Sequence, residues 1–248
     1  MIIRPKTAIP LFLLFAFTGG VLQAQTNKQL WYEYMLNYPF AHSFNLENAF
    51  TYSTVIGQPK WQAFDYNATL EYSVHPNIDL IGAGLVSYTQ QTEAENTLEL
   101  RPTLGAKVHF TPNRRIQTRL LLRLEQRNFK NLETNTWERV MRPRVRGEVV
   151  IPINQVSIFK DNLWYGIMDA EFLFTQTDVQ ERFANRFRLR VGAGYRLSYS
   201  NRFELLYMYQ QSRDAIDETF SSSDNVIRVR FKHYLRKTNP SKVSDLGN

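Results

Sequence analysis

The chain has no cysteine, and beyond its first 24 residues it has no run of about 20 apolar residues, the length that a spanning helix needs. The absence of cysteine excludes a disulfide framework, a thiolate metal site and a thiol nucleophile. The absence of a long apolar run excludes a membrane protein built from helices. Glycine and proline are few, 11 and 10 among 248 residues, and 43% of the residues are apolar. Collagen-like and disordered classes are therefore excluded, and one folded domain is expected.

Residues 1–24 have the layout of a secretory signal peptide. Basic Arg4 and Lys6 precede an apolar run, and small and polar residues lead up to Gln25. A transmembrane anchor is the alternative, but Pro10 and two glycines interrupt the run. We expect export by the Sec route and cleavage before Gln25, which leaves 28 Lys and Arg against 23 Asp and Glu, a net charge of +5. A periplasmic protein and a membrane β-barrel are the classes that remain.

Apolar and polar residues alternate along much of the remaining chain. In residues 64–74, every second residue is apolar and each residue between is polar or acidic. Residues 98–110 repeat the pattern, and in residues 183–197 and 227–235 arginines occupy much of the polar face. A helix has a period of 3.6 residues and cannot produce this pattern, whereas a strand with different environments on its two faces does.

Eleven segments of this kind can be identified in the chain. Each has roughly the 9 to 11 residues that a tilted strand needs to cross a bilayer, or more. Soluble domains are about 20 to 25% strand, and their strands average about 5 to 6 residues, so a soluble β-sandwich is the weaker alternative. The segments are residues 29–38, 43–54, 62–74, 78–90, 97–110, 115–129, 138–151, 163–175, 183–197, 202–213 and 224–235.

The predicted fold is all-β, an antiparallel up-and-down transmembrane β-barrel over residues 25–235 with a polar tail at 236–248. Alternate connections are short and the others longer and polar, as barrels require. The connection near residues 152–162 is long where a short one is expected, and we predict a plug or a short helix there. Because single-chain bacterial barrels have even strand numbers, the sequence predicts ten or twelve strands.

If the apolar faces contact lipid, the polar faces line the lumen, and their charges alternate in sign from strand to strand. This order permits opposite-charge pairs between neighbouring strands, and closure would bring the last strand beside Glu33 of the first. The charges form either a packed polar core or an electropositive passage or binding cavity for anionic solutes. The predicted lumen charges are Glu33, Glu99, Arg101, Arg119, Arg123, Glu125, Arg127, Arg142, Arg144, Arg146, Asp169, Glu171, Arg186, Arg188, Arg190, Glu204, Arg228, Arg230 and Lys232.

Several of these stretches resemble a known family. They include Trp31, Glu99 with Arg101, the Arg-Leu-Glu-Gln-Arg of residues 123–127, and the runs 185–187 and 192–196. From about residue 29 to 235 the chain resembles the uncharacterised Gram-negative outer-membrane barrels of domain-of-unknown-function family 2490. The resemblance implies a barrel in the outer membrane and supplies no catalytic residues. The polar tail departs from outer-membrane barrels in general, which usually end on an aromatic strand.

The four histidines give little sign of catalysis or metal binding. None is expected beside both a serine and an acid on one external face, as a Ser-His-Asp site requires, and their spacing does not suit a metal. We expect no catalytic residue, no metal and no cofactor. The predicted function is a non-enzymatic barrel that is structural or that binds or passes small anionic solutes. An outer-membrane hydrolase or acyltransferase with a site at the rim is the alternative.

Two further patterns are set aside. Two Gly-Ala-Gly stretches lack the third glycine and the following helix of a dinucleotide-binding loop: Gly82-Ala83-Gly84 and Gly192-Ala193-Gly194. We expect them to let the strands bend or to make room for large lumen side chains. The arginine clusters alternate with apolar residues, which argues against nucleic acid. The expected partners are outer-membrane lipid, the barrel-assembly machinery and a small anionic solute.

Overall fold

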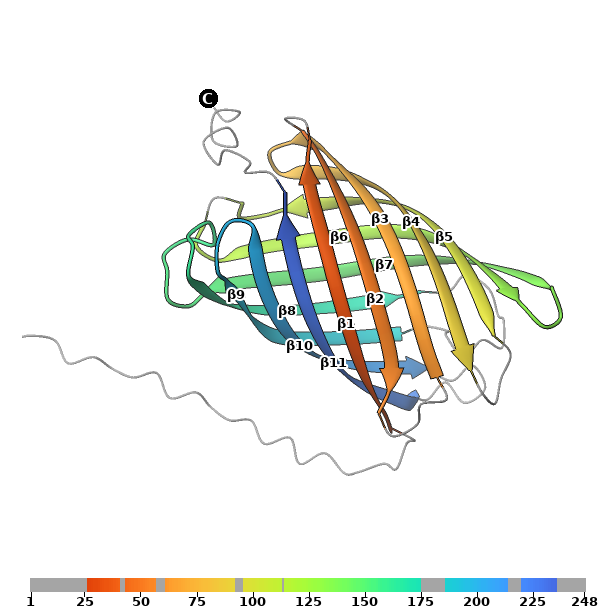
Figure 1. Cartoon of the computed structure of the whole chain (residues 1–248). Coiled ribbons are helices and arrows are strands. Elements are labelled where there is room, and N and C mark those ends of the chain that lie inside the picture. Colours follow the sequence, from red (N-terminus) through yellow and green to blue (C-terminus); the bar gives the residue numbers. More distant parts are fainter. Residues whose placement is uncertain are drawn as a thin grey trace, which may run out of the picture.

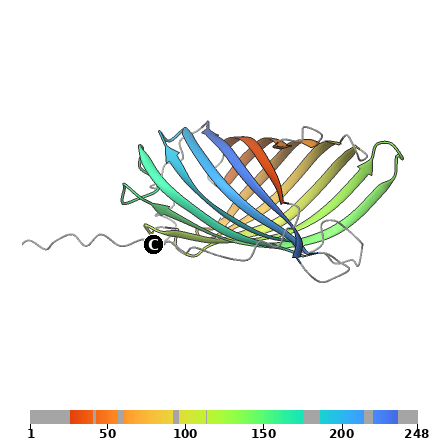
Figure 2. The ribbon, with the colours of Figure 1, turned by 90° about the horizontal axis from the view of Figure 1, so that it is seen from below.

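A computed structural model describes residues 26–40, 43–56, 61–91, 96–112, 114–174, 186–213 and 220–235. In these ranges the chain forms eleven strands that close into a barrel (Figures 1 and 2). No helix of the described ranges is long and apolar enough to cross a membrane. The predicted signal peptide and the tail at 236–248 lie outside the described residues. The strands are β1 (Thr26–Pro39), β2 (Phe44–Val55), β3 (Trp61–His75), β4 (Ile78–Gln91), β5 (Thr97–His109), β6 (Gln117–Asn131), β7 (Trp137–Pro152), β8 (Leu163–Leu173), β9 (Arg186–Arg196), β10 (Asn201–Arg213) and β11 (Phe220–Tyr234).

The predicted barrel is confirmed, and each alternating segment corresponds to one strand. Alternation predicts these strands well because each one separates lipid from lumen along its length. In β8 the exposure alternates at every residue. Trp164, Met168 and Phe172 face outward and are about half exposed, whereas Asp169 and Glu171 point inward and are buried.

The prediction of ten or twelve strands was wrong, because the barrel closes with eleven. Ten neighbouring pairs are antiparallel, and the closing pair of β1 with β11 is parallel (Figure 1). In this pair Glu33 lies opposite Arg230. An odd number of alternating strands leaves the first and last running in the same direction, so they can only pair in parallel. The even-number expectation assumes that both chain ends emerge on one side of the membrane. Here β1 begins at one end of the barrel, the N-terminal end, and β11 finishes at the other, the C-terminal end.

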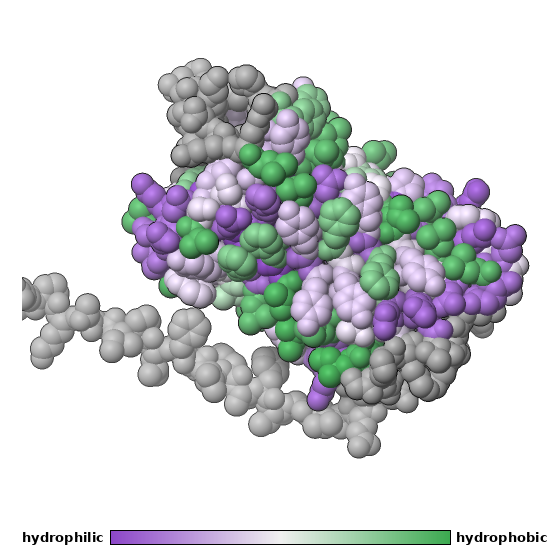
Figure 3. Space-filling model, viewed as in Figure 1, coloured by the Kyte–Doolittle hydropathy of each residue, from purple (hydrophilic) through white to green (hydrophobic). Residues whose placement is uncertain are grey.

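The outward side chains make an apolar and aromatic band. Rings of neighbouring strands contact one another along it: Tyr32 stacks on Tyr52, with ring centroids 6.4 Å apart, and Phe64 packs against Tyr52 in a tilted arrangement at 5.0 Å. Figure 3 shows apolar side chains interleaved with paler aromatic ones over the face that Figure 1 presents. Aromatic rings of this kind favour the headgroup region of a bilayer.

The hairpin of β6 and β7 extends beyond its neighbours (Figures 1 and 2). The outward side chains of β6 are apolar from Leu120 to Leu124 and polar from Gln126 onward. The apolar band therefore ends near residue 125 on this strand, and the far part of the hairpin stands outside the band.

Candidate functional site

The barrel encloses a cavity of about 860 Å³ that every strand lines. Its lining runs from Ser43, Pro76 and Tyr199 at the C-terminal end to Trp31 and Arg127 in the other half of the barrel. Fifteen lysines and arginines line it, against nine aspartates and glutamates. The cavity is therefore basic, and it is not filled by the side chains around it.

Sixteen of the nineteen predicted lumen charges line this cavity. Glu99 and Glu171 also point inward, but they are buried among arginines in the wall. Arg186 begins β9, and its side chain lies outside the described part of the chain.

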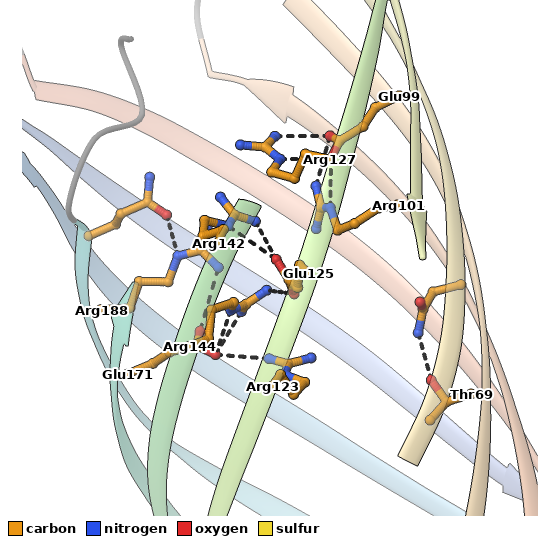
Figure 4. A network of polar contacts seen from close by, with 12 residues as sticks. Thr69, Glu99, Arg101, Arg123, Glu125, Arg127, Arg142, Arg144, Glu171 and Arg188 are labelled. Carbon is orange, nitrogen blue, oxygen red and sulfur yellow. Dashed lines mark hydrogen bonds and ion pairs between the residues drawn. The ribbon is translucent and has the colours of Figure 1, made fainter. Parts of the chain in front are cut away.

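The most buried carboxylate, that of Glu171 on β8, collects arginines from three other strands. Its Oε1 lies 2.6 Å from Arg144 Nη2 on β7 and 2.9 Å from Arg123 Nη2 on β6. Its Oε2 lies 3.6 Å from Arg188 Nη1 on β9. Figure 4 shows these guanidinium groups pointing toward the carboxylate. The side chain of Glu171 has no exposed surface, so these ion pairs are shielded from water.

The same network continues toward the N-terminal end. Glu125 pairs with Arg142 at 2.8 Å and also with Arg144, which joins it to Glu171. Nearer that end, Glu99 accepts hydrogen bonds from Arg127 at 2.7 Å and from Arg101 at 2.6 Å (Figure 4). The wall from β5 to β9 is thus a packed layer of ion pairs, which confirms the predicted pairing of neighbouring strands.

A second cluster joins the two ends of the sheet. Glu33 on β1 pairs with Arg230 on β11, and Arg228 lies 3.5 Å from the same carboxylate. Arg230 also reaches Glu204 on β10 at 2.9 Å, and Lys232 does the same at 2.9 Å. Parallel pairs are slightly less stable per residue than antiparallel ones, so these charges reinforce the seam where the barrel closes.

Eight further charged residues line the cavity and were not among the predicted site residues. Glu148 illustrates the reason: it pairs with Arg119, and it shares its face of β7 with Arg142, Arg144 and Arg146, so alternation alone could have identified it. On β2 and β3 the acidic residues lie among uncharged polar ones, so the sequence pattern identifies them less clearly as lumen charges. The eight are Glu47, Asp65, Glu71, Asp79, Lys107, Glu148, Arg196 and Arg202.

The connection at residues 153–162 folds into the mouth at the C-terminal end. Ile158 packs against a lumen cluster that includes Leu163 and Tyr165, and its carbonyl accepts a hydrogen bond from Arg196 Nη1 at 2.9 Å. Ile158 and Phe159 both line the cavity. The segment is a series of bends and turns rather than the short helix that was the other expectation, and its position is that of a partial plug.

Gly194 makes room for the Tyr165 ring, which was one of the two roles expected for the glycine pairs. A Cβ at position 194 would lie 2.2 Å from Tyr165 Cζ, and the Tyr165 hydroxyl donates a 2.8 Å hydrogen bond to Glu204. We expect Gly194→Ala to destabilise the barrel by about 1 to 3 kcal/mol, because the ring must leave its place. Gly166→Ala is the matched control, since a Cβ there meets nothing within 4 Å.

The two variants can be compared by urea unfolding in detergent micelles. The Tyr165→Ala background removes the ring with which the new Cβ would clash. Gly194→Ala should therefore lower the free energy of unfolding by less in that background than in the wild type. Equal destabilisation by Gly194→Ala and Gly166→Ala would contradict this packing.

A histidine, an acid and a serine meet at the rim on the lumen side, whereas the expectation from the sequence concerned an external face. Asp79 accepts a 2.6 Å hydrogen bond from Ser73 Oγ, and its other oxygen lies 2.8 Å from His109 Nε2. Three neighbouring strands bring these residues together, helped by a register shift near residue 74, and alternation within one strand does not reveal it. The carboxylate, not the imidazole, accepts the hydrogen bond from Ser73 Oγ, whereas a serine nucleophile needs the imidazole as its base. In the described ranges no group of three His, Asp or Glu is arranged to hold a metal.

Comparisons with known proteins agree with this architecture. A family model described as a protein of unknown function, DUF2490, matches residues 28–221. The solved structure titled "NanC porin structure in rhombohedral crystal form" superposes with a TM-score of 0.53. It shares 10% sequence identity, over 84% of this chain and 98% of that one, and at this identity the likeness concerns the fold alone. None of the curated proteins matches the chain.

Proposed function

Because the chain belongs to the family of unknown function DUF2490 and forms a porin-like β-barrel, we propose that it is a Gram-negative outer-membrane protein that admits small anionic solutes into its lumen. The observation that carries the proposal is the excess of basic side chains around the cavity. Even when the buried Glu99 and Glu171 are added to the nine acidic lining residues, fifteen basic residues face eleven acidic ones. Low-dielectric walls focus the field of this excess and favour anions inside.

Two features support a narrow passage rather than a wide one. The arginines of the β5 to β9 wall are tied to carboxylates and occupy space, and residues 153–162 obstruct the mouth at the C-terminal end. Since short turns of outer-membrane barrels face the periplasm, we place this end on the periplasmic side. Solutes would therefore pass one at a time and lose part of their water shell.

Conductance of purified protein in a planar bilayer tests the proposal. We expect small, intermittent steps with anion preference, since filling of the lumen opposes the favourable field. Replacing Ile158 and Phe159 with glycine should raise the step size and leave the ion preference unchanged, because the change removes bulk and no charge. Large, steady wild-type conductance would contradict the obstructed lumen, and cation preference would contradict the charge argument.

For the other partners, the outward apolar and aromatic band supports contact with outer-membrane lipid and insertion by the barrel-assembly machinery. We propose neither a nucleic-acid partner nor an enzymatic role. The hydrogen bonds at the rim support the absence of an enzymatic role. Ser73 donates to Asp79 and not to His109, so His109 is not placed to act as its base. Hydrolysis of an ester or phospholipid that disappears in Ser73→Ala would favour the hydrolase alternative instead.

A further inference from the structure

The charges of the cavity are segregated across the barrel. Among the described lining residues, β1 to β4 contribute five acids and no lysine or arginine, whereas β9 to β11 contribute seven basic residues and one acid. The acidic wall, β1 to β4, and the basic wall, β9 to β11, are separate arcs of the ring, and they adjoin at the seam of β1 with β11. Within these walls, β3 and β9 lie on opposite sides of the barrel. The acids are Glu33, Glu47, Asp65, Glu71 and Asp79, and the bases are Arg188, Arg190, Arg196, Arg202, Arg228, Arg230 and Lys232.

Three arginines interact with Asp169: Arg190 of the basic wall by a hydrogen bond, and Arg228 of the same wall and Arg146 of β7 electrostatically. Arg190 donates to Asp169 through Nε at 2.7 Å, while its Nη2 has no hydrogen-bond partner in the described part of the molecule and makes only a long ion pair, of 3.8 Å, with Glu171 Oε2. Arg228 and Arg146 lie within electrostatic range of the same carboxylate, and the Nε of each is also unmatched there. Arg190 and Arg228 are only 6% and 7% exposed. Buried guanidinium groups in excess over carboxylates favour an oxyanion as their missing partner.

Trp31 helps to hold this group at the cavity. The guanidinium of Arg228 stacks over the Trp31 ring, 4.5 Å from its centroid, and both side chains line the cavity. The nearest carboxylate to Arg228, that of Glu33, is 3.5 Å away and is shared with Arg230. Arg146 has an ion pair of 3.9 Å with Glu148, which is itself paired with Arg119. Arg228 and Arg146 thus have only long or shared ion pairs and are available to bind the carboxylate of a solute.

On the acidic wall, Asp65 and Glu47 are the carboxylates without an ion pair within the described residues. Asp65 hydrogen-bonds Ser87 and interacts electrostatically with Arg101 and, more weakly, with Arg228. Glu47 interacts electrostatically with Glu71, which repels it, and with Lys232 and Lys107, which attract it. Both carboxylates line the cavity and are partly accessible, so each can be reached from the lumen.

We propose that the solute of this cavity is a small zwitterion, whose carboxylate binds Arg146, Arg190 and Arg228 while its ammonium group turns toward Asp65 and Glu47. The proposal rests on the proposed function, since the solute still binds through its carboxylate, and it adds an ammonium group as a second requirement. A plain anion satisfies the arginines but is repelled by the unpaired carboxylates of the acidic wall. A plain cation is attracted by the carboxylates but repelled by the arginines. A zwitterion has a group of the opposite sign for each.

Uptake of two matched probes into proteoliposomes tests this proposal. β-Alanine and 3-hydroxypropionate differ only in carrying an ammonium or a hydroxyl group. We expect wild-type protein to take up β-alanine several-fold faster, roughly threefold to tenfold. The double variant Asp65→Asn, Glu47→Gln should lose that preference and take up 3-hydroxypropionate faster than the wild type does. Arg146→Gln should slow both probes.

The gel shift between heated and unheated samples confirms that each variant is folded before its uptake is measured. Equal uptake of the two probes by the wild type would overturn the zwitterion proposal and leave anion entry standing. An unchanged β-alanine preference in the double variant would also overturn it. If neither probe enters and no anion current is seen, the proposed function fails, and this inference fails with it.

Discussion

Leu122→Arg should prevent most of the protein from assembling in the membrane. Leu122 faces outward at 41% exposure and lies in the middle of the apolar stretch that β6 presents to lipid. An arginine on the lipid face near mid-depth costs roughly 2 to 4 kcal/mol. Semi-native gel electrophoresis of the membrane fraction provides the measurement, since a folded barrel migrates faster unheated than after boiling.

The adjacent residue provides the control. Arg123 points into the lumen, and Arg123→Leu removes one of the arginines around Glu171 while Arg144 and Arg188 remain. This variant should insert normally and lose only part of its stability. If Leu122→Arg and Arg123→Leu were tolerated equally, the assignment of outward and inward faces would be wrong.

Glu171→Gln should destabilise the folded barrel by about 3 to 5 kcal/mol, because it removes the carboxylate from a buried ion-pair network and leaves guanidinium charge uncompensated. The substitution keeps the shape of the side chain, so the loss reports charge rather than volume. Urea unfolding in micelles measures it. Glu138→Gln is the matched control, since Glu138 is exposed on the projecting hairpin and its change should stay within about 0.5 kcal/mol.

A double-mutant cycle identifies the partner that matters most. Arg144 contacts Glu171 at 2.6 Å, while Arg188 lies at 3.6 Å and also donates to Gln210. Glu171→Gln should therefore couple to Arg144→Gln by about 1 to 3 kcal/mol and to Arg188→Gln by less. Absence of coupling at both positions would contradict the ion-pair network as the source of stability.

Alternation in the sequence determined the strands, the facing of their side chains and most of the lumen charges. Each strand of this barrel separates lipid from a polar lumen, so a two-residue period appears wherever a strand crosses. Because face assignment follows from parity alone, Glu99 and Arg127 could be placed inside without knowing their partners. The pairing of Glu33 with the last strand also followed, since closure joins the first and last strands whatever their number.

Only the tertiary structure decided what depends on how separate strands meet. The odd strand number and the parallel seam depend on which chain ends share a side of the barrel, and periodicity within a strand carries no such information. Ser73, Asp79 and His109 meet across three strands through a register shift, and residues 153–162 have no period from which their fold into the mouth could be inferred. The cavity, with its acidic and basic walls, likewise results from the closure of eleven strands, because only the closed ring brings the acids of β1 to β4 and the bases of β9 to β11 around one volume.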